Sequence, residues 1–205
     1  IAEGRRLQRP TILLTPDGAG DPAALWYGHN YDEEPADGHR CWLSVHATMI
    51  PSFDGRGWLS IFTDDKACQG GRVDVSPEPH RPDGVRLYPK EIAVLPTIDA
   101  VIALGSPAVE RWLAQNEWQR DEPYNSNFRD HAIVEKYEAI ERQENPFYWK
   151  GVYASLGGWH MGWPDDDWHE LLDAKLLVHT YMDSEPWVEV WQLPSGEMKV
   201  IQRIT

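Results

Sequence analysis

Cysteine and long apolar runs are scarce in this 205-residue chain. Its two cysteines, Cys41 and Cys68, are too few for a zinc cage and do not form a C-x-x-C pair. We interpret them as buried thiols, and a single disulfide is the alternative if the protein is secreted. No uncharged apolar run approaches the roughly 18–20 residues of a membrane-spanning helix, and the N-terminal residues show no signal-peptide pattern. We therefore expect a soluble, cytoplasmic protein that does not bind a membrane.

Basic residues are also in the minority. The chain has 19 Lys and Arg against 33 Asp and Glu, which gives a formal net charge of −14. Binding to a nucleic-acid backbone requires clustered Lys and Arg, so this charge argues against nucleic acid as a partner.

Catalytic motifs are missing too: there is no G-x-x-x-x-G-K-[ST] loop, and Ser155 lacks the preceding glycine of a nucleophile elbow. These absences favour a binding protein over an enzyme, without deciding between them.

Short apolar runs bounded by turn formers indicate a β-rich fold. The segments 41–50 and 58–62 flank a Gly-containing turn, which predicts a hairpin. The segments 187–191 and 197–204 flank Pro194-Ser195-Gly196 and predict a second hairpin. Further strands are expected at Thr11 to Leu14, Arg72 to Val75 and Val85 to Tyr88.

Two helices are predicted between the strand-rich parts of the chain. Ser106 followed by Pro107 is typical of a helix start, so one helix should extend to about Trp118. A second should run over residues 127–143, where apolar residues recur at helical spacing. Before them, Pro96 should divide the apolar segment 92–104 into two pieces. We expect the two helices to pack on a face of the sheet through Val109, Trp112, Leu113, Phe128, Ile133, Tyr137 and Ile140.

Two segments of the chain are similar to each other. Residues 43–49 and 176–182 share Leu, Val, His and Met at identical offsets, and a Trp-containing strand and a Gly turn follow each of them. We interpret this similarity as a diverged duplication, which places His46 and His179 on the same relative sheet face. The predicted fold class is α+β: β-rich, antiparallel sheets in two related halves with a two-helix insert. We expect one domain over residues 1–205, with halves around 41–105 and 147–205 and the insert at 106–145.

The same two segments carry a resemblance to a protein family. Residues 42–50 followed by 57–62 resemble the first of two strand copies in the YwqG-like bacterial proteins, and residues 176–185 resemble the second. Gly157-Gly158 and Gly162-Trp163-Pro164 are similar to the Gly-Pro segment that precedes the second copy. His46 and His179 stand where the family usually has Gln, and the family's early Gly-Gly-x-Pro signature is absent. The resemblance implies a β-rich fold with no established activity.

The segment 157–189 is the richest in chemically active side chains. Its Asp165-Asp166-Asp167 run precedes Trp168-His169-Glu170. Carboxylates with imidazoles can ligate zinc or calcium, but we favour the interpretation that the Asp run caps a helix. Residues 169–173 differ from the H-E-x-x-H motif only at the last position, where Asp173 replaces histidine. A zinc hydrolase centred on His160, His169 and Asp173 is therefore an alternative function.

Tryptophan is abundant, with eleven residues. In the strand patterns, Trp58, Trp187 and Trp191 are expected to be core residues or cross-strand partners. Trp159, Trp163 and Trp168 lie among Gly, Pro and Asp, so we expect them to be exposed. Indoles beside carboxylates in a loop are typical of a site for a small molecule or a peptide, and stacked indoles also suit a glycan.

We therefore predict a binding or interaction protein without a cofactor, whose partner is a small molecule, a glycan or a peptide. The negative loop should favour cationic or hydroxyl-rich ligands and repel phosphates. A glycan-binding module and the zinc hydrolase, with zinc or calcium as the cofactor, are the alternatives. The predicted ligand-binding residues are Trp159, His160, Trp163, Asp165, Asp167, His46 and His179.

Overall fold

The structure of the protein is a computed structural model that describes residues 1–28, 38–64, 70–116, 131–144, 150–159, 171, 173–180 and 187–203. Its strands are β1 (Arg9–Thr15), β2 (Ala24–Trp26), β3 (His39–His46), β4 (Trp58–Asp64), β5 (Gly71–Ser76), β6 (Val85–Val94), β7 (Ala154–Gly157), β8 (Lys175–Thr180), β9 (Trp187–Gln192) and β10 (Met198–Arg203). Its helices are α1 (Ala2–Arg6), α2 (Ile98–Leu104), α3 (Pro107–Gln115) and α5 (Ala132–Glu144), with a 3-10 turn η1 (Ala47–Met49).

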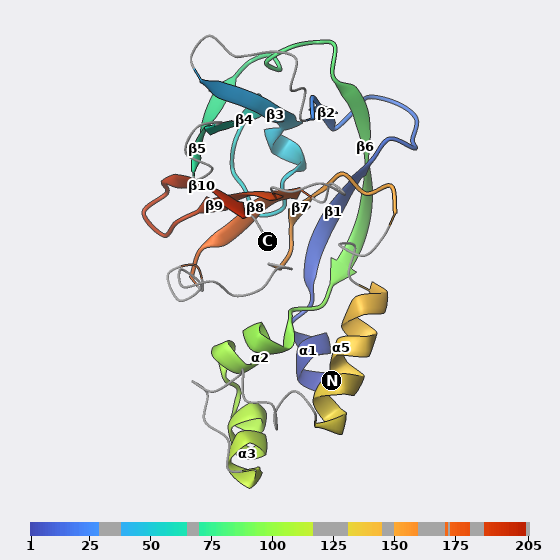
Figure 1. Ribbon diagram of the computed structural model, residues 1–205, viewed down its shortest axis with the longest axis vertical. Coiled ribbons are helices and arrows are strands. Elements are labelled where there is room, and N and C mark those ends of the chain that lie inside the picture. The colour runs from blue at the N-terminus through green and yellow to red at the C-terminus, as the bar shows by residue number, and fades with distance from the viewer. Residues whose placement is uncertain are drawn as a thin grey trace.

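The strands of the described residues form one antiparallel sheet in the order β10-β9-β8-β7-β1-β6-β2-β3-β4-β5. The sheet curls until its two outer strands, β5 and β10, lie against each other (Figure 1). At this seam the side-chain Nε2 of Gln202 donates to the carbonyl of Gly70 at 2.7 Å. The result is a nearly closed barrel, and the chain is a β-rich α+β protein, as the sequence predicts.

Both predicted hairpins are confirmed, although the first strand, predicted over 41–50, ends at His46, and Ala47–Met49 form η1 instead. β3 pairs with β4 from His46 opposite Trp58 to His39 opposite Asp64, and β9 pairs with β10. The turn before β4 needs glycine at Gly57, because its φ is +79° and a Cβ there would lie 2.4 Å from a backbone oxygen. Glycine at this position thus lets the chain enter β4 beside Ser76, the last residue of β5.

Alternate side chains of the strands fill the barrel interior. Leu43 of β3 lies opposite Ile61 of β4, and both are fully buried. The ring of Trp26 on β2 lies 5.7 Å from the ring of Trp42 and 5.7 Å from the ring of Tyr153, edge-on in both cases. The interior is therefore a packed core that contains an aromatic cluster.

The cysteine prediction is confirmed for Cys41, which is free and buried. Burial raises the pKa of the Cys41 thiol to about 12. The nucleophilic thiolate is therefore scarce at neutral pH, and the thiol acts as a small apolar side chain. Cys68 lies outside the described residues.

The two predicted helices correspond to α3 and α5. At the start of α3 the Ser106 hydroxyl accepts a hydrogen bond from the amide of Val109 at 3.3 Å, so the predicted cap is confirmed. α5 begins at Ala132, since His131 before it is not helical, so the predicted helix over 127–143 is wrong at that position; the predicted start at Asn127 lies outside the described residues. Pro96 divides the segment 92–104 as expected, because β6 ends before it and α2 begins after it.

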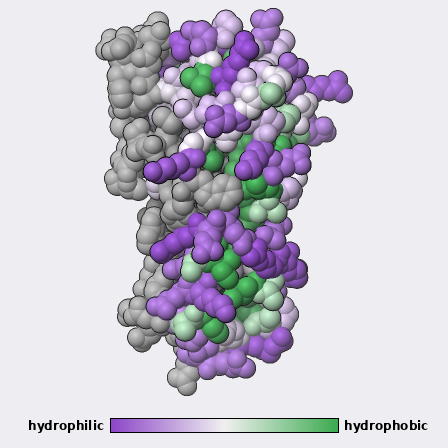
Figure 2. All heavy atoms as spheres, turned by 90° about the vertical axis from the view of Figure 1, so that its right-hand side faces the viewer, coloured by the Kyte–Doolittle hydropathy of each residue, from purple (hydrophilic) through white to green (hydrophobic). Residues whose placement is uncertain are grey.

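The expectation that the helices pack on a sheet face is wrong. Figure 1 shows them grouped at one end of the barrel, where α3 and α5 are joined by α1 and α2, so the described helices exceed the predicted pair. Their apolar residues form a cluster separate from the barrel core: Ile98, Val101, Ile102, Val109, Leu113, Val134 and Tyr137. On the face that Figure 2 shows, polar side chains predominate and apolar ones lie between them in patches.

The predicted apolar stripe of the second helix is also corrected. The buried positions of α5 are Val134, Tyr137 and Glu141, whereas Ile133 is 45% exposed and Ile140 is half-buried. The reason is that α1 approaches α5 closely at Tyr137, and this approach is possible because Gly4 of α1 has no side chain. A Cβ on Gly4 would lie 2.3 Å from the hydroxyl oxygen of Tyr137.

Two adjacent residues of α5 test this helix orientation. We expect Val134→Ala to lower the free energy of unfolding by about 2–3 kcal/mol, because Val134 is 0% exposed and its loss leaves a cavity. Ile133→Ala is the control, with an expected change within about 0.5 kcal/mol although it removes more atoms. Urea denaturation followed by far-UV circular dichroism measures both. A larger loss for Ile133→Ala would contradict the orientation.

Candidate functional site

Of the predicted ligand loop, the structure describes Trp159, and the other residues lie outside the described part: His160, Trp163, Asp165, Asp167, Trp168 and His169. Trp159 is 7% exposed, so the expectation that it is exposed is wrong. Its Nε1 donates to the carbonyl of Leu7 at 2.8 Å, and the guanidinium carbon of Arg9 lies 3.4 Å from its ring centre. Gly158 makes this burial possible, since its φ is +87° and a Cβ there would lie 2.3 Å from Oγ1 of Thr11.

The structure does not bring His46 and His179 together. Four strands separate β3 from β8, namely β7, β1, β6 and β2, and in the other direction β4, β5, β10 and β9 lie between them. The Nδ1 of His46 is 2.7 Å from Oγ1 of Thr48, and its ring packs edge-on against Trp58, with 5.3 Å between centroids. The ring of His179 is 6.4 Å from that of Trp187. Each histidine therefore has its own aromatic neighbour on an opposite side of the barrel.

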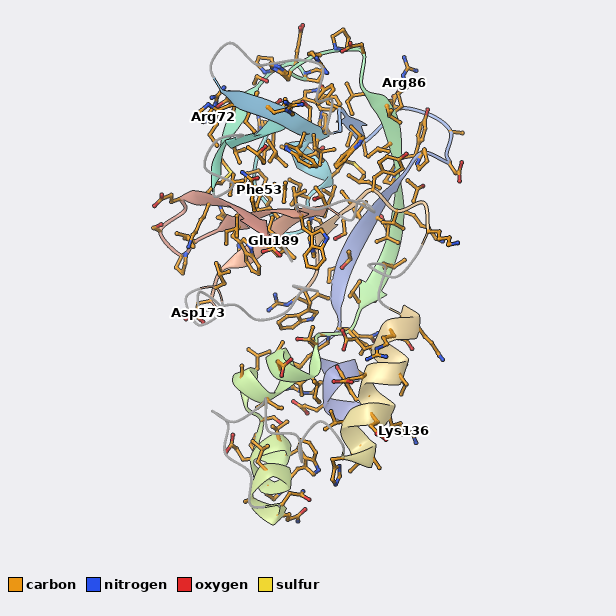
Figure 3. The ribbon with its side chains drawn as sticks, viewed as in Figure 1. Phe53, Arg72, Arg86, Lys136, Asp173 and Glu189 are labelled. Atoms are coloured by element: carbon orange, nitrogen blue, oxygen red, sulfur yellow. The ribbon has the colours of Figure 1, made fainter. Side chains whose placement is uncertain are left out.

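The third predicted metal ligand, Asp173, is exposed beside the start of β8 (Figure 3). With Lys175 and Gln192 it lines a surface hollow of ≈ 240 Å³. Within the part of the chain that the structure describes, no group of three or more His, Cys, Asp and Glu residues suits a metal ion. His160 and His169 are not described, so the zinc and calcium alternatives stay predictions.

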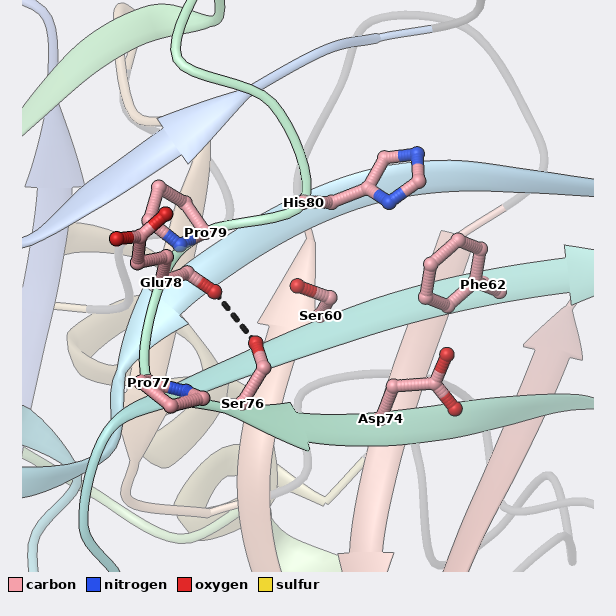
Figure 4. Close-up of a pocket in the computed structure, with 8 residues that line it drawn as sticks. All are labelled: Ser60, Phe62, Asp74, Ser76, Pro77, Glu78, Pro79 and His80. Atoms are coloured by element: carbon pink, nitrogen blue, oxygen red, sulfur yellow. Dashed lines mark hydrogen bonds between the residues drawn. The ribbon is translucent and has the colours of Figure 1, made fainter.

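A larger depression lies on the outer face of β4 and β5, and its volume is ≈ 450 Å³ (Figure 4). We call it the β4–β5 depression. β4 and β5 line one side, and the residues directly after β5 line the other. Its lining residues are Ser60, Phe62, Asp74, Ser76, Pro77, Glu78, Pro79 and His80.

The strand register explains why these side chains share one face. Ser60 of β4 lies opposite Asp74 of β5, and cross-strand partners point to the same side of a sheet. Ser60 and Phe62 are two residues apart, as are Asp74 and Ser76, so alternation places each pair on this face. Pro77 then follows directly, and the chain leaves β5 because proline cannot continue the ladder.

The segment 77–81, which we call the strap, is held by hydroxyl groups beneath it. The Tyr27 hydroxyl donates to the Arg81 carbonyl at 2.7 Å and accepts from the Arg81 amide at 3.2 Å. The Ser44 hydroxyl accepts from the amide of His80 at 3.1 Å and lies 2.8 Å from the hydroxyl of Ser60. Burial raises the pKa of Tyr27, so its hydroxyl keeps its hydrogen. These bonds hold the rim of the depression in place.

The described contacts do not pair a nucleophile with a base at this site. The His80 ring packs edge-on against Phe62, with 5.0 Å between ring centroids, while the hydroxyl of Ser60 is bonded to Ser44. Nucleophilic catalysis needs a base within about 2.6–3.2 Å of the hydroxyl.

No motif of the sequence marks these residues as a site. One signal was available: Ser60 interrupts the apolar segment Trp58-Leu59-Ser60-Ile61-Phe62, yet it is 2% exposed. A buried hydroxyl within an apolar strand needs hydrogen-bond partners, which points to a polar neighbour on that face. Nothing in the sequence shows that this neighbour is the strap.

No family model matches the chain, and no curated protein or solved structure is significantly similar to it. Among the helices of the described residues, none is long and apolar enough to cross a membrane.

Proposed function

We propose that the protein binds a small polar molecule and that the β4–β5 depression is its ligand site. The observation that carries this proposal is the position of Ser60. Its side chain is 2% exposed and lines the depression, and a hydroxyl offers three hydrogen-bonding positions. The described residues use one of them, the bond to Ser44. A ligand in the depression would use the others.

The size and rigidity of the depression support this proposal. Sites for small molecules are typically about 300–1,000 Å³ and combine apolar walls with a few polar groups. The volume here is ≈ 450 Å³, with Phe62 and two prolines beside hydroxyls and carboxylates. Because hydrogen bonds already hold the strap, a ligand would not have to order the rim, and preorganised sites bind more tightly.

A protein-observed NMR screen with small polar fragments tests the site. We expect the fragments that bind to shift the amide signals of Ser76, Glu78 and His80. The substitution Ser60→Ala should lower the affinity for these fragments about three- to tenfold, because one hydrogen bond is lost. Ser195→Ala, in the turn before β10, is the matched control and should leave binding unchanged. Shifts confined to the hollow beside Asp173, or unaltered binding by Ser60→Ala, would contradict the proposal.

The interpretation of the fold as two related halves is part of the same proposal. In its support, β3 is third from the β5 end of the strand order and β8 is third from the β10 end. Val45 and Val178 lie in the barrel core, so alternation directs the adjacent His46 and His179 outward from the barrel. The proposed relationship to the YwqG-like proteins rests on these two strands as well. On this interpretation, the β4–β5 depression is a feature of the first half.

A further inference from the structure

We infer that the ligand of the β4–β5 depression carries a cationic nitrogen with N–H donors, such as an ammonium or a guanidinium group. This inference rests on the proposed function and concerns the chemical class of the ligand. It follows from three observations: the hydrogen-bonding capacity of the lining, its charge, and the position of a guanidinium group that the chain itself places beside it.

Apart from His80, whose ring carries at least one N–H donor, the polar side chains of the lining offer mainly acceptors. The carboxylates of Asp74 and Glu78 accept only, when ionised. The hydroxyl of Ser76 donates its single hydrogen to the carbonyl of Glu78, so lone pairs are what it has left (Figure 4). Ser60 and Ser44 share one hydrogen bond, and whichever of them donates, Ser60 keeps at least one lone pair. A ligand that satisfies this set must supply donor hydrogens.

Carboxylates outnumber basic side chains in the lining. Asp74 and Glu78 contribute two carboxylates, His80 is the single basic side chain, and the lining residues include neither Lys nor Arg. The chain as a whole has a formal net charge of −14. Anions are therefore repelled, and a hydrogen bond from a cation to a carboxylate is about twice as strong as one between neutral groups.

A guanidinium group of the chain already lies at the border of the depression. The guanidinium carbon of Arg72 is 4.4 Å from the centroid of the Phe62 ring, and its Nε is 3.4 Å from Oδ2 of Asp74. An aromatic face beside a carboxylate is a favourable environment for a cation. Asp74 remains half-exposed next to Arg72, so its carboxylate can accept a second cation from the side of the depression.

Four compounds with one carbon skeleton test the inference by NMR titration: n-propylammonium, n-propyltrimethylammonium, n-propanol and propionate. We expect n-propylammonium to shift the amides of Ser76, Glu78 and His80 with a dissociation constant at least tenfold lower than that of n-propanol. The trimethylated cation, which keeps the charge and lacks N–H groups, should bind more weakly than n-propylammonium, and propionate should not bind. n-Propylguanidinium distinguishes the two cationic groups and should bind in the same place.

Three variants separate a binding role from a structural one. Asp74→Asn should lower the affinity for n-propylammonium about ten- to a hundredfold, because a charged hydrogen bond is lost. Asp17→Asn is the control: it removes the same charge from the loop after β1 and should leave the affinity unchanged. Arg72→Gln should raise the affinity for n-propylammonium about threefold, because it removes a neighbouring positive charge. A structural role for Arg72 would instead weaken binding.

The outcomes distinguish the inference from the proposed function. If n-propanol or propionate binds in the depression as tightly as n-propylammonium, the site stands and its cation preference is wrong. If no compound of this set or of the polar fragment screen shifts these amides, both the inference and the proposed function are wrong.

Discussion

Replacing Glu189 by alanine should lower the free energy of unfolding by about 3–5 kcal/mol, because two buried polar side chains lose a neighbour at once and each buried polar group left unsatisfied costs about 1–3 kcal/mol. Glu189 on β9 is 0% exposed and lies opposite His179 of β8 (Figure 3). Its Oε2 accepts from Nε1 of Trp191 at 2.9 Å, and its Oε1 lies 3.8 Å from Nε2 of His179, which is also 0% exposed. Glu189→Ala removes the carboxylate from both groups where water cannot replace it. Urea denaturation at pH 7 measures the loss.

Two glutamate variants control this prediction. Glu189→Gln keeps an acceptor oxygen for the indole of Trp191, so it should lower the free energy of unfolding by less, about 1–3 kcal/mol. Glu197→Ala changes an exposed glutamate in the same hairpin and should stay within about 0.5 kcal/mol of the parent protein. If Glu189→Ala were as mild as Glu197→Ala, the buried carboxylate would not support its two neighbours.

Trp26→Ala should destabilise the protein by about 3–5 kcal/mol, as expected for the loss of a large buried side chain. Trp26 is 4% exposed and lies on the three-residue strand β2, between β3 and β6. The substitution opens a cavity in the barrel core and removes two edge-on aromatic contacts, with Trp42 and Tyr153. Chemical denaturation measures the stability, and near-UV circular dichroism should lose intensity because the aromatic cluster is disrupted.

Trp58→Ala is the matched control for Trp26→Ala. Trp58 is half-buried on the outer face of β4, where its ring contacts His46. Trp58→Ala should therefore lower the free energy of unfolding much less than Trp26→Ala, and it should leave the barrel core intact. A larger loss for Trp58→Ala would mean that the stabilising aromatic contacts lie outside the barrel.

Both hairpins and most strands of the described residues were predictable because they depend on neighbouring residues, whereas β2 and β7 were not predicted. Gly57 sets the turn before β4, and alternation along the following strand decides which side chains face the core. The cap at Ser106 is equally local, since its partner is the amide of Val109 three residues away. Such features need only a short segment of chain, so the sequence pattern contains them.

The orientation of α5 was not predictable in this way. Apolar residues lie on more than one side of this helix, and both Ile133 and Val134 fit a helical pattern. The helix buries the side of Val134 and Tyr137 because α1, from the other end of the chain, approaches through Gly4. The burial of Trp159 has the same origin, since the carbonyl that accepts its hydrogen bond belongs to Leu7.

By itself, the sequence determined the β-rich class, the two hairpins, the start of α3 and the strongly negative charge. Only the tertiary structure decided that the sheet curls into a nearly closed barrel and that the helices form their own cluster at its end. It also decided that Ser60, Asp74 and His80 line one depression. The physical reason is distance along the chain: the strap is held by Tyr27 and Ser44, which lie on other parts of the sheet. Hydrogen bonds between remote segments form only once the strands have paired, so no local pattern of residues encodes them.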